Sequence, residues 1–400
     1  MASPMYVDAG TGATDAGSDW SYTCQAAAAA GNLFIVQVLQ DGVTSNALAV
    51  TGSTNINNLA GSAGWTQLAE MTFGLSSYLF VGRSTSTSAP TISGTNTTSE
   101  DLYIRSYQFK NVNTGTTLSD ICENVTAGSW DFEYGSGAMV SDNDVTTLGA
   151  DRLPLQFVFV GDDNTIAAFG SYSGGYWWQQ NTWAESSGTD GAISLSTGRV
   201  GVGSWGNNGN EEAVYGGSGT GEAVAQSFQC PAATYRTVYA KIRRWASPTD
   251  NLVCEVQTDN GGEPSGTVVG TGGSRLASEF DNVAPREEAF SINATLSAST
   301  TYWLVFTRSG SRDVTNYATV NVQLDDRFSG YSATRDSGTW NTALEDTSFL
   351  IEPSGGTLGS ATASITDSDP WMSIGVALIG TTAAAAKSLL RPVRHHLIHR

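Results

Sequence analysis

The densest aromatic cluster of the chain lies in the segment GYWWQQNTW, which contains Trp177, Trp178 and Trp183. Adjacent residues of a β-strand point to opposite faces of the sheet, so at least one of the two neighbouring tryptophans is expected to be exposed. An exposed indole beside neutral amides can stack on a sugar ring, and it can equally form a hot spot of a protein interface. Packing of the rings in the core or at a domain contact is the alternative.

A second aromatic set lies close to turn residues and comprises Trp245, Phe328, Tyr331 and Trp340, with Arg327 and Arg335 close to it in sequence. Loops on a rigid scaffold carry a large share of binding residues. These side chains are therefore candidate ligand-binding residues for a glycan or a protein partner. The alternative is that they are unrelated core and surface aromatics.

Four pairs of closely spaced aspartates are the candidates for metal binding: Asp142/Asp144, Asp162/Asp163, Asp325/Asp326 and Asp367/Asp369. None of them has the spacing of an EF-hand calcium loop. Aspartates in turns usually bond to their own backbone, although two suitably spaced carboxylates would also serve a glycosidase. The sequence predicts no metal ligand and no cofactor, with Ca²⁺ at one of the pairs left open.

Residues 1–394 contain no histidine, because all 3 histidines lie at the C-terminus. Ser-His-Asp and Cys-His catalysis and histidine-ligated zinc are therefore excluded from this part of the chain. A general acid or base there would have to be Asp, Glu, Tyr or Lys. We expect no enzymatic activity and no catalytic residue. A glycan depolymerase is the least favoured alternative, since the sequence lacks the long parallel-helix repeats typical of such enzymes.

The C-terminal segment KSLLRPVRHHLIHR combines basic and large apolar side chains and contains no acid. It holds four of the 19 Lys and Arg residues, so the first 386 residues carry 15 basic and 38 acidic side chains. A basic segment on an acidic body predicts a docking peptide that fills an apolar groove of a partner and pairs with its carboxylates. A solvated chain end is the alternative. The expected docking residues are Leu389, Leu390, Arg391, Arg394, Leu397, Ile398 and Arg400.

The composition is acidic, rich in glycine and poor in charge, with a net charge of −19, 45 glycines and 14% charged residues. The negative charge argues against nucleic acid and anionic membranes as partners. We find no apolar run of membrane-spanning length and no N-terminal signal peptide. The four cysteines lack metal-binding spacing, so free buried thiols are expected, with a Cys230–Cys254 disulfide left open.

Strand signals recur along the chain, whereas helical periodicity is nearly absent. Several strands alternate with a period of two, and turn residues separate them at short intervals, which is the pattern of a β-sandwich. The clearest predicted strands are Asn32–Gln40, Trp65–Thr72, Tyr78–Arg83, Leu102–Phe109, Leu155–Val160, Ala192–Val202 and Trp371–Ile379.

Two glycine-rich runs, at 201–221 and 353–359, divide the chain. The block between them has its own strands and ten of the 19 Lys and Arg residues, and the two strands after it have no core of their own. We therefore predict a discontinuous sandwich (1–215 plus 354–380), a second sandwich (222–352) inserted in one of its loops, and a basic tail (381–400). Two consecutive domains are the alternative.

The segments GNLFIVQVLQDG, GWTQLAEM, YLFVGRSTSTSAPTISG, SEDLYIRSYQFKNV and LPLQFVFVGDDNT resemble a jelly-roll-like domain that recurs in exterior proteins of tailed-phage virions. DPWMSIGVALIG is similar to its closing strand. The inserted block resembles a β-sandwich module of phage fibres and bacterial surface proteins, through QSFQCP, YRTVYAKIRRWASPTDNLVCEVQTDNGGEPSGTVV and STTYWLVFTRSG. In that family the module is regarded as an adhesive or carbohydrate-binding accessory.

The resemblance implies an all-β, non-enzymatic structural component of the virion exterior: a tail fibre, head fibre, spike or decoration protein made in the bacterial cytoplasm. It would be a homo-oligomer, and proteins of this kind in virions are most often trimers. It would dock onto other virion proteins through its tail and attach to the host through a surface glycan. The alternative is a carbohydrate-binding module of a cell-surface protein.

Overall fold

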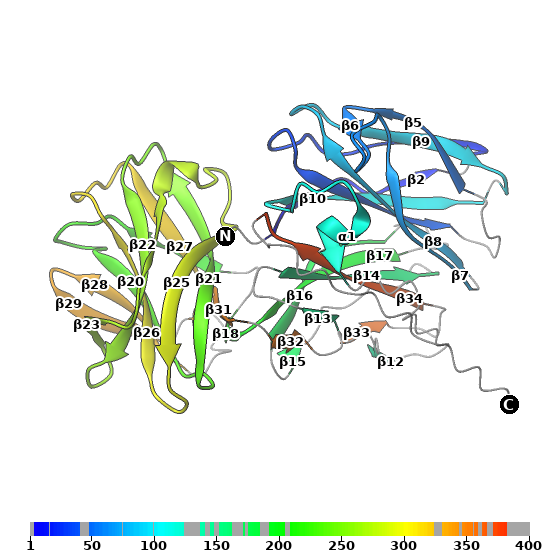
Figure 1. Cartoon of the computed structure of the whole chain (residues 1–400). Helices are drawn as coiled ribbons and strands as arrows, with labels where there is room; N and C mark the ends of the chain where they lie inside the picture. The colour runs from blue at the N-terminus through cyan, green and yellow to red at the C-terminus, as the bar shows by residue number, and fades with distance from the viewer. Residues whose placement is uncertain are drawn as a thin grey trace, which may run out of the picture.

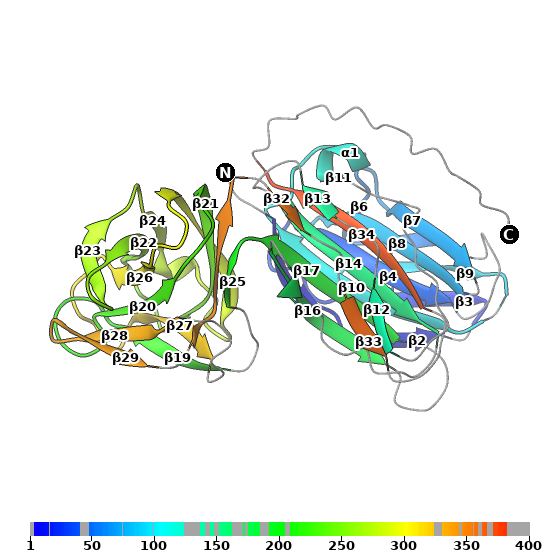
Figure 2. The ribbon, with the colours of Figure 1, turned by 90° about the horizontal axis from the view of Figure 1, so that it is seen from below.

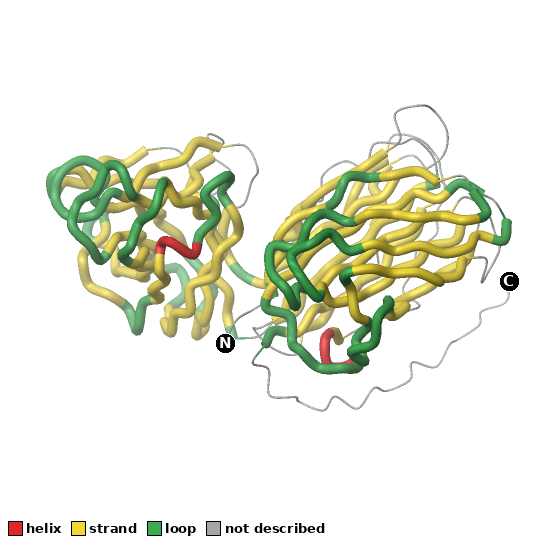
Figure 3. The backbone as a smooth tube through the Cα atoms, turned by 90° about the horizontal axis from the view of Figure 1, so that it is seen from above, coloured by secondary structure: helices red, strands yellow, loops and turns green. Residues whose placement is uncertain are grey.

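The computed structural model describes residues 4–15, 17–40, 48–73, 75–98, 100–123, 137–140, 145–147, 152–161, 171–172, 175–184, 192–204, 209–323, 330–343, 346–354, 356–358, 362–365 and 371–381. They form an almost entirely β structure (Figure 3), which confirms the predicted all-β sandwich fold. The helices described are α1 (Leu118–Ile121) and the 3₁₀ turn η1 (Ala277–Glu279). In the described ranges, no helix has the length and hydropathy needed to cross a bilayer.

The first body is built around a central antiparallel sheet. Its strand order is β1 (Met5–Ala9), β10 (Leu102–Lys110), β4 (Leu33–Gln40), β8 (Leu75–Ser84) and β6 (Ile56–Asn57), with β2 (Ala13–Asp15) on β10 and β7 (Thr66–Phe73) on β8. All eight residues of β4 are buried. A strand buried on both faces reads as a continuous apolar run, so this sheet must be covered on both sides.

Two further sheets cover it, which makes three layers (Figures 1 and 2). One consists of β3 (Asp19–Thr23), β9 (Thr91–Asn96) and β5 (Leu48–Thr54). The other has the order β11 (Cys122–Glu123), β34 (Trp371–Ile379), β14 (Arg152–Val160), β17 (Ala192–Val200), β16 (Gly175–Ala184) and β15 (Ser171–Tyr172). The ribbons β12 (Gly137–Val140) with β33 (Thr362–Ile365), and β13 (Val145–Thr147) with β32 (Gly356–Leu358), complete this body.

The side chains of β10 show how the layers are held together. Tyr103 and Tyr107 belong to the core shared with the β14–β34 sheet, and Leu102 and Ile104 belong to the core shared with the β3–β9–β5 sheet. The Tyr107 hydroxyl donates to Gln37 Oε1 at 2.8 Å inside the first core. The alternation in this segment therefore separates two cores and not a core from solvent.

The second body is a two-sheet sandwich around a core of its own. One sheet has the order β18 (Val202–Ser204), β31 (Phe349–Pro353), β21 (Ala233–Trp245), β27 (Tyr317–Gln323) and β19 (Gly209–Val214), with β25 (Arg286–Leu296) on β21 and β30 (Asp346–Thr347) on β27. The other has β23 (Pro264–Val268), β22 (Asn251–Asp259), β26 (Tyr302–Arg308), β20 (Ala223–Phe228), β28 (Ser332–Asp336) and β29 (Thr339–Ala343), with β24 (Gly273–Leu276) on β22.

The chain leaves the first body after β17 and returns to it with β32, β33 and β34. β34 pairs with β14 over its whole length and with β11 on its other side, so the closing strand lies in the first body (Figure 1, red among the blue and green strands). The predicted limits differ from the pairing at one point. β18 and β19 lie before residue 215 but pair with β31 and β27 of the second body, because their partners are more than a hundred residues away and leave no local signal.

All four cysteines, Cys24, Cys122, Cys230 and Cys254, are buried and free, as expected from their spacing. Burial raises the pKa of the Cys24 thiol to about 12. A Cys230–Cys254 bridge is not formed.

The two bodies meet through a buried charged contact. Arg199, at the end of β17, is fully buried and donates to Glu287 Oε1 of β25 at 2.6 Å. Its guanidinium also donates to the Pro4 carbonyl at 2.7 Å and lies 3.9 Å from the ring centre of Tyr239. Lys110 adds an ion pair with Glu288 at 3.3 Å. These contacts fix the orientation of the second sandwich relative to the first body.

Lys241, beside Glu287 in the β21–β25 ladder, gives a pH prediction. Desolvation lowers the pKa of Lys241 from 10.5 to about 8 in the folded chain. Between these values the unfolded chain binds the proton that the folded chain has released, so the free energy of unfolding rises with pH. Below pH 8 the destabilisation is complete.

Lys241→Met is therefore expected to stabilise the protein by about 1–2 kcal/mol at pH 7. The gain over the wild type should shrink as the pH rises towards 10.5. Urea unfolding of both proteins at pH 7, 9 and 10.5 measures this. A variant that is less stable at pH 7 would show that the ammonium group contributes more through its contacts than it costs in desolvation.

Candidate functional site

The tryptophans of the first aromatic set lie on β16. The backbone register places Trp177 opposite Gly198, Trp178 opposite Thr197 and Trp183 opposite Ile193 on β17, with a bulge between Gln179 and Asn181. The side chains of these tryptophans lie outside the described structure, so their role as ligand-binding residues stays a prediction.

Two other predicted sites fall on residues that the structure does not describe. The docking set in the tail, Leu389 to Arg400, is one, and the four aspartate pairs are the other. In the part of the chain that is described, no group of three or more His, Cys, Asp or Glu side chains is placed to hold a metal ion.

The described candidate site is one end of the second sandwich, which we call the Trp245 end. Five connections meet there: 215–222, 246–250, 277–285, 309–316 and the turn 337–338. Trp245 lies at this end with 42% of its surface exposed, and Trp340 lies beside the 337–338 turn. Tyr331 is also exposed, but it lies at the opposite end, where its carbonyl accepts from the Ser227 amide at 2.9 Å.

An aromatic row runs across the Trp245 end. The Trp245 and Tyr317 rings stack with centroids 6.0 Å apart, since these residues are partners in the β21–β27 ladder. Tyr317 meets Tyr215 edge to face at 4.8 Å. Arginines lie at both ends of the row: Arg243 is 4.3 Å from the centre of the Trp245 ring, and Arg312 is 5.6 Å from that of Tyr215. The rings fix one another, so a ligand would meet a surface that is already ordered.

Backbone hydrogen bonds tie the loops of this end together. The Asp313 amide donates to the Tyr215 carbonyl at 3.0 Å, and the Ser337 amide donates to the Gly219 carbonyl at 2.7 Å. The Asp313 carboxylate accepts from the Asn316 backbone amide and from its side chain, which lowers the pKa of Asp313 to about 2. These bonds fix the conformation of the 309–316 loop and attach it to the 215–222 loop.

The ion pair between Asp250 and Arg308 is the centre of this arrangement. Arg308 Nε donates to both Asp250 oxygens at 3.0 Å, and its side chain is only 3% exposed. Its Nη1 donates to the Tyr215 carbonyl at 3.0 Å, while Asp250 Oδ2 accepts from the Gly310 amide at 2.9 Å. One buried pair thus connects three of the five loops.

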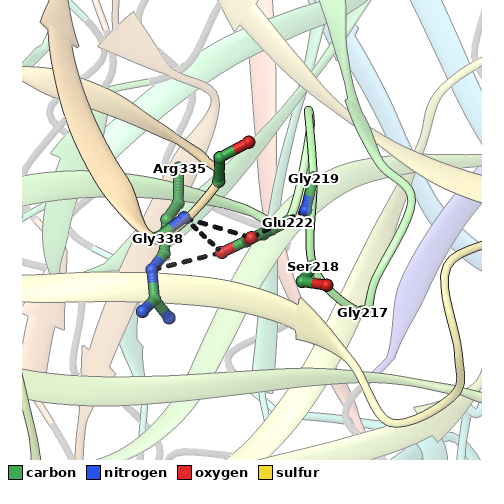
Figure 4. A pocket seen from close by; sticks show the side chains of 7 residues that line it. Gly217, Ser218, Gly219, Glu222, Arg335 and Gly338 are labelled. Carbon is green, nitrogen blue, oxygen red and sulfur yellow. Dashed lines mark hydrogen bonds and ion pairs between the residues drawn. The ribbon is translucent and has the colours of Figure 1, made fainter.

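A pocket with a volume of about 490 Å³ opens beside the aromatic row and is lined by Gly217, Ser218, Gly219, Glu222, Arg335, Ser337 and Gly338 (Figure 4). The buried Glu222 carboxylate accepts from the Gly219 amide at 2.8 Å and from the Gly338 amide at 3.1 Å. It also pairs with Arg335 Nε at 3.3 Å. The floor of the pocket is therefore polar and hydrogen-bonded.

The loops of the Trp245 end also carry apolar side chains in contact with solvent. Val283 is 76% exposed and Val314 is 52% exposed, in the 277–285 and 309–316 loops. Apolar surface rimmed by polar groups is typical of interaction sites. With its aromatic row, its arginines and its pocket, the Trp245 end can stack on a ligand and bind its polar groups.

Sequence reasoning found Trp245, Trp340 and Arg335 but missed Tyr215, Tyr317 and Arg312. Tyr215 lies inside the glycine-rich run 201–221, and Tyr317 reaches Trp245 only through strand pairing. The glycine run itself was the available signal: positive backbone φ angles at Gly217 (62°) and Gly219 (132°) shape the loop that forms the pocket wall.

Neither a protein family nor a curated protein matches this chain in sequence.

Proposed function

We propose that this chain is a non-enzymatic structural protein of a tailed-phage virion exterior, a fibre, spike or decoration component, which binds a host-surface glycan through the Trp245 end of its second sandwich. The aromatic row of exposed Trp245 and partly buried Tyr317 and Tyr215 carries this proposal. Aromatic faces stack on sugar rings, and loops at one end of a β-sandwich are a common place for binding residues.

The rest of the proposal comes from the sequence resemblance and the charge distribution. The chain assembles as a homo-oligomer, a trimer, and its basic tail docks onto acidic neighbours in the particle. Nucleic acid and membranes are not among its partners, in keeping with the net charge of −19. Several weak glycan sites on one oligomer then add up to useful avidity.

Trp245→Ala is expected to weaken glycan binding at least tenfold, because an aromatic side chain that becomes buried under a ligand is worth about 2 kcal/mol at a hot spot. Binding of the full chain to an array of bacterial surface glycans would be measured first. The glycans that bind would then be titrated against the wild type and each variant. Tyr331→Ala is the matched control, as an aromatic at the opposite end that is more exposed (55%) than Trp245 (42%). Equal losses in both variants would place the glycan site elsewhere.

The virion location is tested separately by immunogold electron microscopy of particles from the source culture with antibody to residues 222–352. Gold on tail tips or fibres supports a host-recognition protein, and gold over the head supports a decoration or head-fibre protein. Particles without label overturn the virion proposal. They would favour the second candidate, a carbohydrate-binding module of a cell-surface protein, which the separate core of the second sandwich also allows.

A further inference from the structure

We propose that the Trp245 end is specific for acidic glycans: the pocket beside the aromatic row binds the carboxylate of a uronate-type or sialate-type sugar through Arg335 and Arg312. This inference rests on the proposed glycan-binding function and names its ligand class. It depends on three features of the site: the continuity of row and pocket, the outward-facing charge of two arginines, and a glycine-rich wall on which Arg312 packs.

Arg312 connects the row to the pocket. Its guanidinium lies 5.6 Å from the Tyr215 ring centre and donates to Thr220 Oγ1 at 2.9 Å. Thr220 directly follows the Gly217–Gly219 wall of the pocket. A glycan chain stacked on the aromatic row therefore reaches the pocket with its next sugar, so the two features form one extended site.

The charge that the pocket offers to a ligand is positive. Glu222 is almost fully enclosed, with its side chain 8% exposed, and its oxygens already accept from two backbone amides and from Arg335 Nε. The Arg335 side chain is 45% exposed, and its terminal nitrogens point away from Glu222 (Figure 4). Such a planar fork suits a carboxylate bound by two parallel hydrogen bonds.

Arg312 adds a second cation on the other side of the wall. Arg312 is exposed, and among the described residues its guanidinium group donates a hydrogen bond to a hydroxyl group and not to a carboxylate. The wall between the two arginines consists of small residues, and a Cβ atom at Gly219 would come within 2.8 Å of Arg312 Nε. Arg312 therefore packs directly against the Gly217–Gly219 wall, and Arg335 lines the pocket itself.

Two guanidinium groups face this site, although the chain as a whole carries a net charge of −19. A neutral glycan in the pocket would displace water from the two guanidinium groups without pairing their charge, which costs free energy. A carboxylate pairs with them at short range, where screening by salt is weak. The pocket thus favours a glycan that carries a carboxylate at this position, while the rest of the glycan stacks on the aromatic row.

The test uses the full-length chain and matched probes: oligogalacturonate and other uronate-bearing or sialate-bearing oligosaccharides on an array, each beside its carboxyl-reduced neutral form. We expect at least tenfold tighter binding to an acidic form than to its reduced counterpart. Arg335→Gln and Arg312→Gln should each remove most of this preference, because binding to the acidic form should fall much further than binding to the reduced form. Arg236→Gln, an exposed arginine bonded to Asn293 at the opposite end, is the control that should alter neither.

The outcomes separate the two proposals. Equal binding to acidic and reduced forms, or a preference that survives both arginine substitutions, overturns the carboxylate site while glycan binding by the aromatic row stands. Failure of every oligosaccharide to bind overturns the proposed function and the carboxylate site with it. Circular dichroism of Arg335→Gln excludes misfolding as the cause of a loss, because the Gly219 and Gly338 amides still hold Glu222.

Discussion

Replacing Arg199 with methionine is expected to lower the free energy of unfolding by about 3–5 kcal/mol, since it deprives a buried carboxylate of the guanidinium group that it pairs with. Glu287 is 8% exposed and receives the Arg199 guanidinium at 2.6 Å. The same guanidinium binds the Pro4 and Arg152 carbonyls of the first body, at 2.7 and 3.0 Å. One side chain therefore holds the N-terminus, the end of β17 and the second sandwich together.

The double variant Arg199→Met with Glu287→Gln separates charge from packing. It should recover a large part of the loss, because the uncompensated buried charge is removed. Urea unfolding gives the stability, and small-angle X-ray scattering of the single variant should show larger dimensions as the two bodies separate. Unchanged stability and dimensions in Arg199→Met would mean that the junction does not depend on the contacts of Arg199.

The sequence was sufficient to predict the class of fold and most of the strands, because turn residues and period-two patterns are local signals. Leu33–Gln40 and Leu102–Lys110 were found almost residue for residue. The third layer was not predicted. An apolar run shows that a strand is buried, but it does not show that two different sheets cover its faces.

The limits of the second body were harder to predict for a related reason. Val202–Ser204 and Gly209–Val214 lie within a glycine-rich segment that reads as a linker, yet both are strands of the second sandwich. Their partners, Phe349–Pro353 and Tyr317–Gln323, come much later in the chain. Pairing across such a distance is decided by tertiary packing and not by local propensity.

The candidate site was predicted only in part, through two tryptophans and Arg335. Trp245 and Trp340 stand out by residue type, whereas the importance of Tyr215, Tyr317 and Asp250 arises from contacts between loops that are far apart in the sequence. Asp250 follows a proline-containing turn and would be taken for a solvated residue. In the fold it pairs with Arg308 across 58 residues.

Arg308→Met is expected to lower the free energy of unfolding by about 2–4 kcal/mol and to weaken glycan binding at the Trp245 end. The substitution removes the bonds from Arg308 to Asp250 and to the Tyr215 carbonyl. It leaves Asp250, with a side chain 14% exposed, without its cation. Backbone amides of 215–222, 246–250 and 309–316 should then exchange hydrogen faster than in the wild type, because local opening becomes easier.

Arg286→Met is the matched control at the same end. Arg286 pairs with Asp281 at 3.5 Å, but the two side chains are 36% and 31% exposed. An exposed pair is worth about 0–1 kcal/mol, so this variant should keep both its stability and its glycan binding. If Arg308→Met and Arg286→Met behave alike, the loops do not depend on the buried pair. If Arg308→Met alone speeds exchange in the three loops and loses binding, the glycan site depends on loops held in place by Asp250 and Arg308, and the aromatic row by itself is not sufficient.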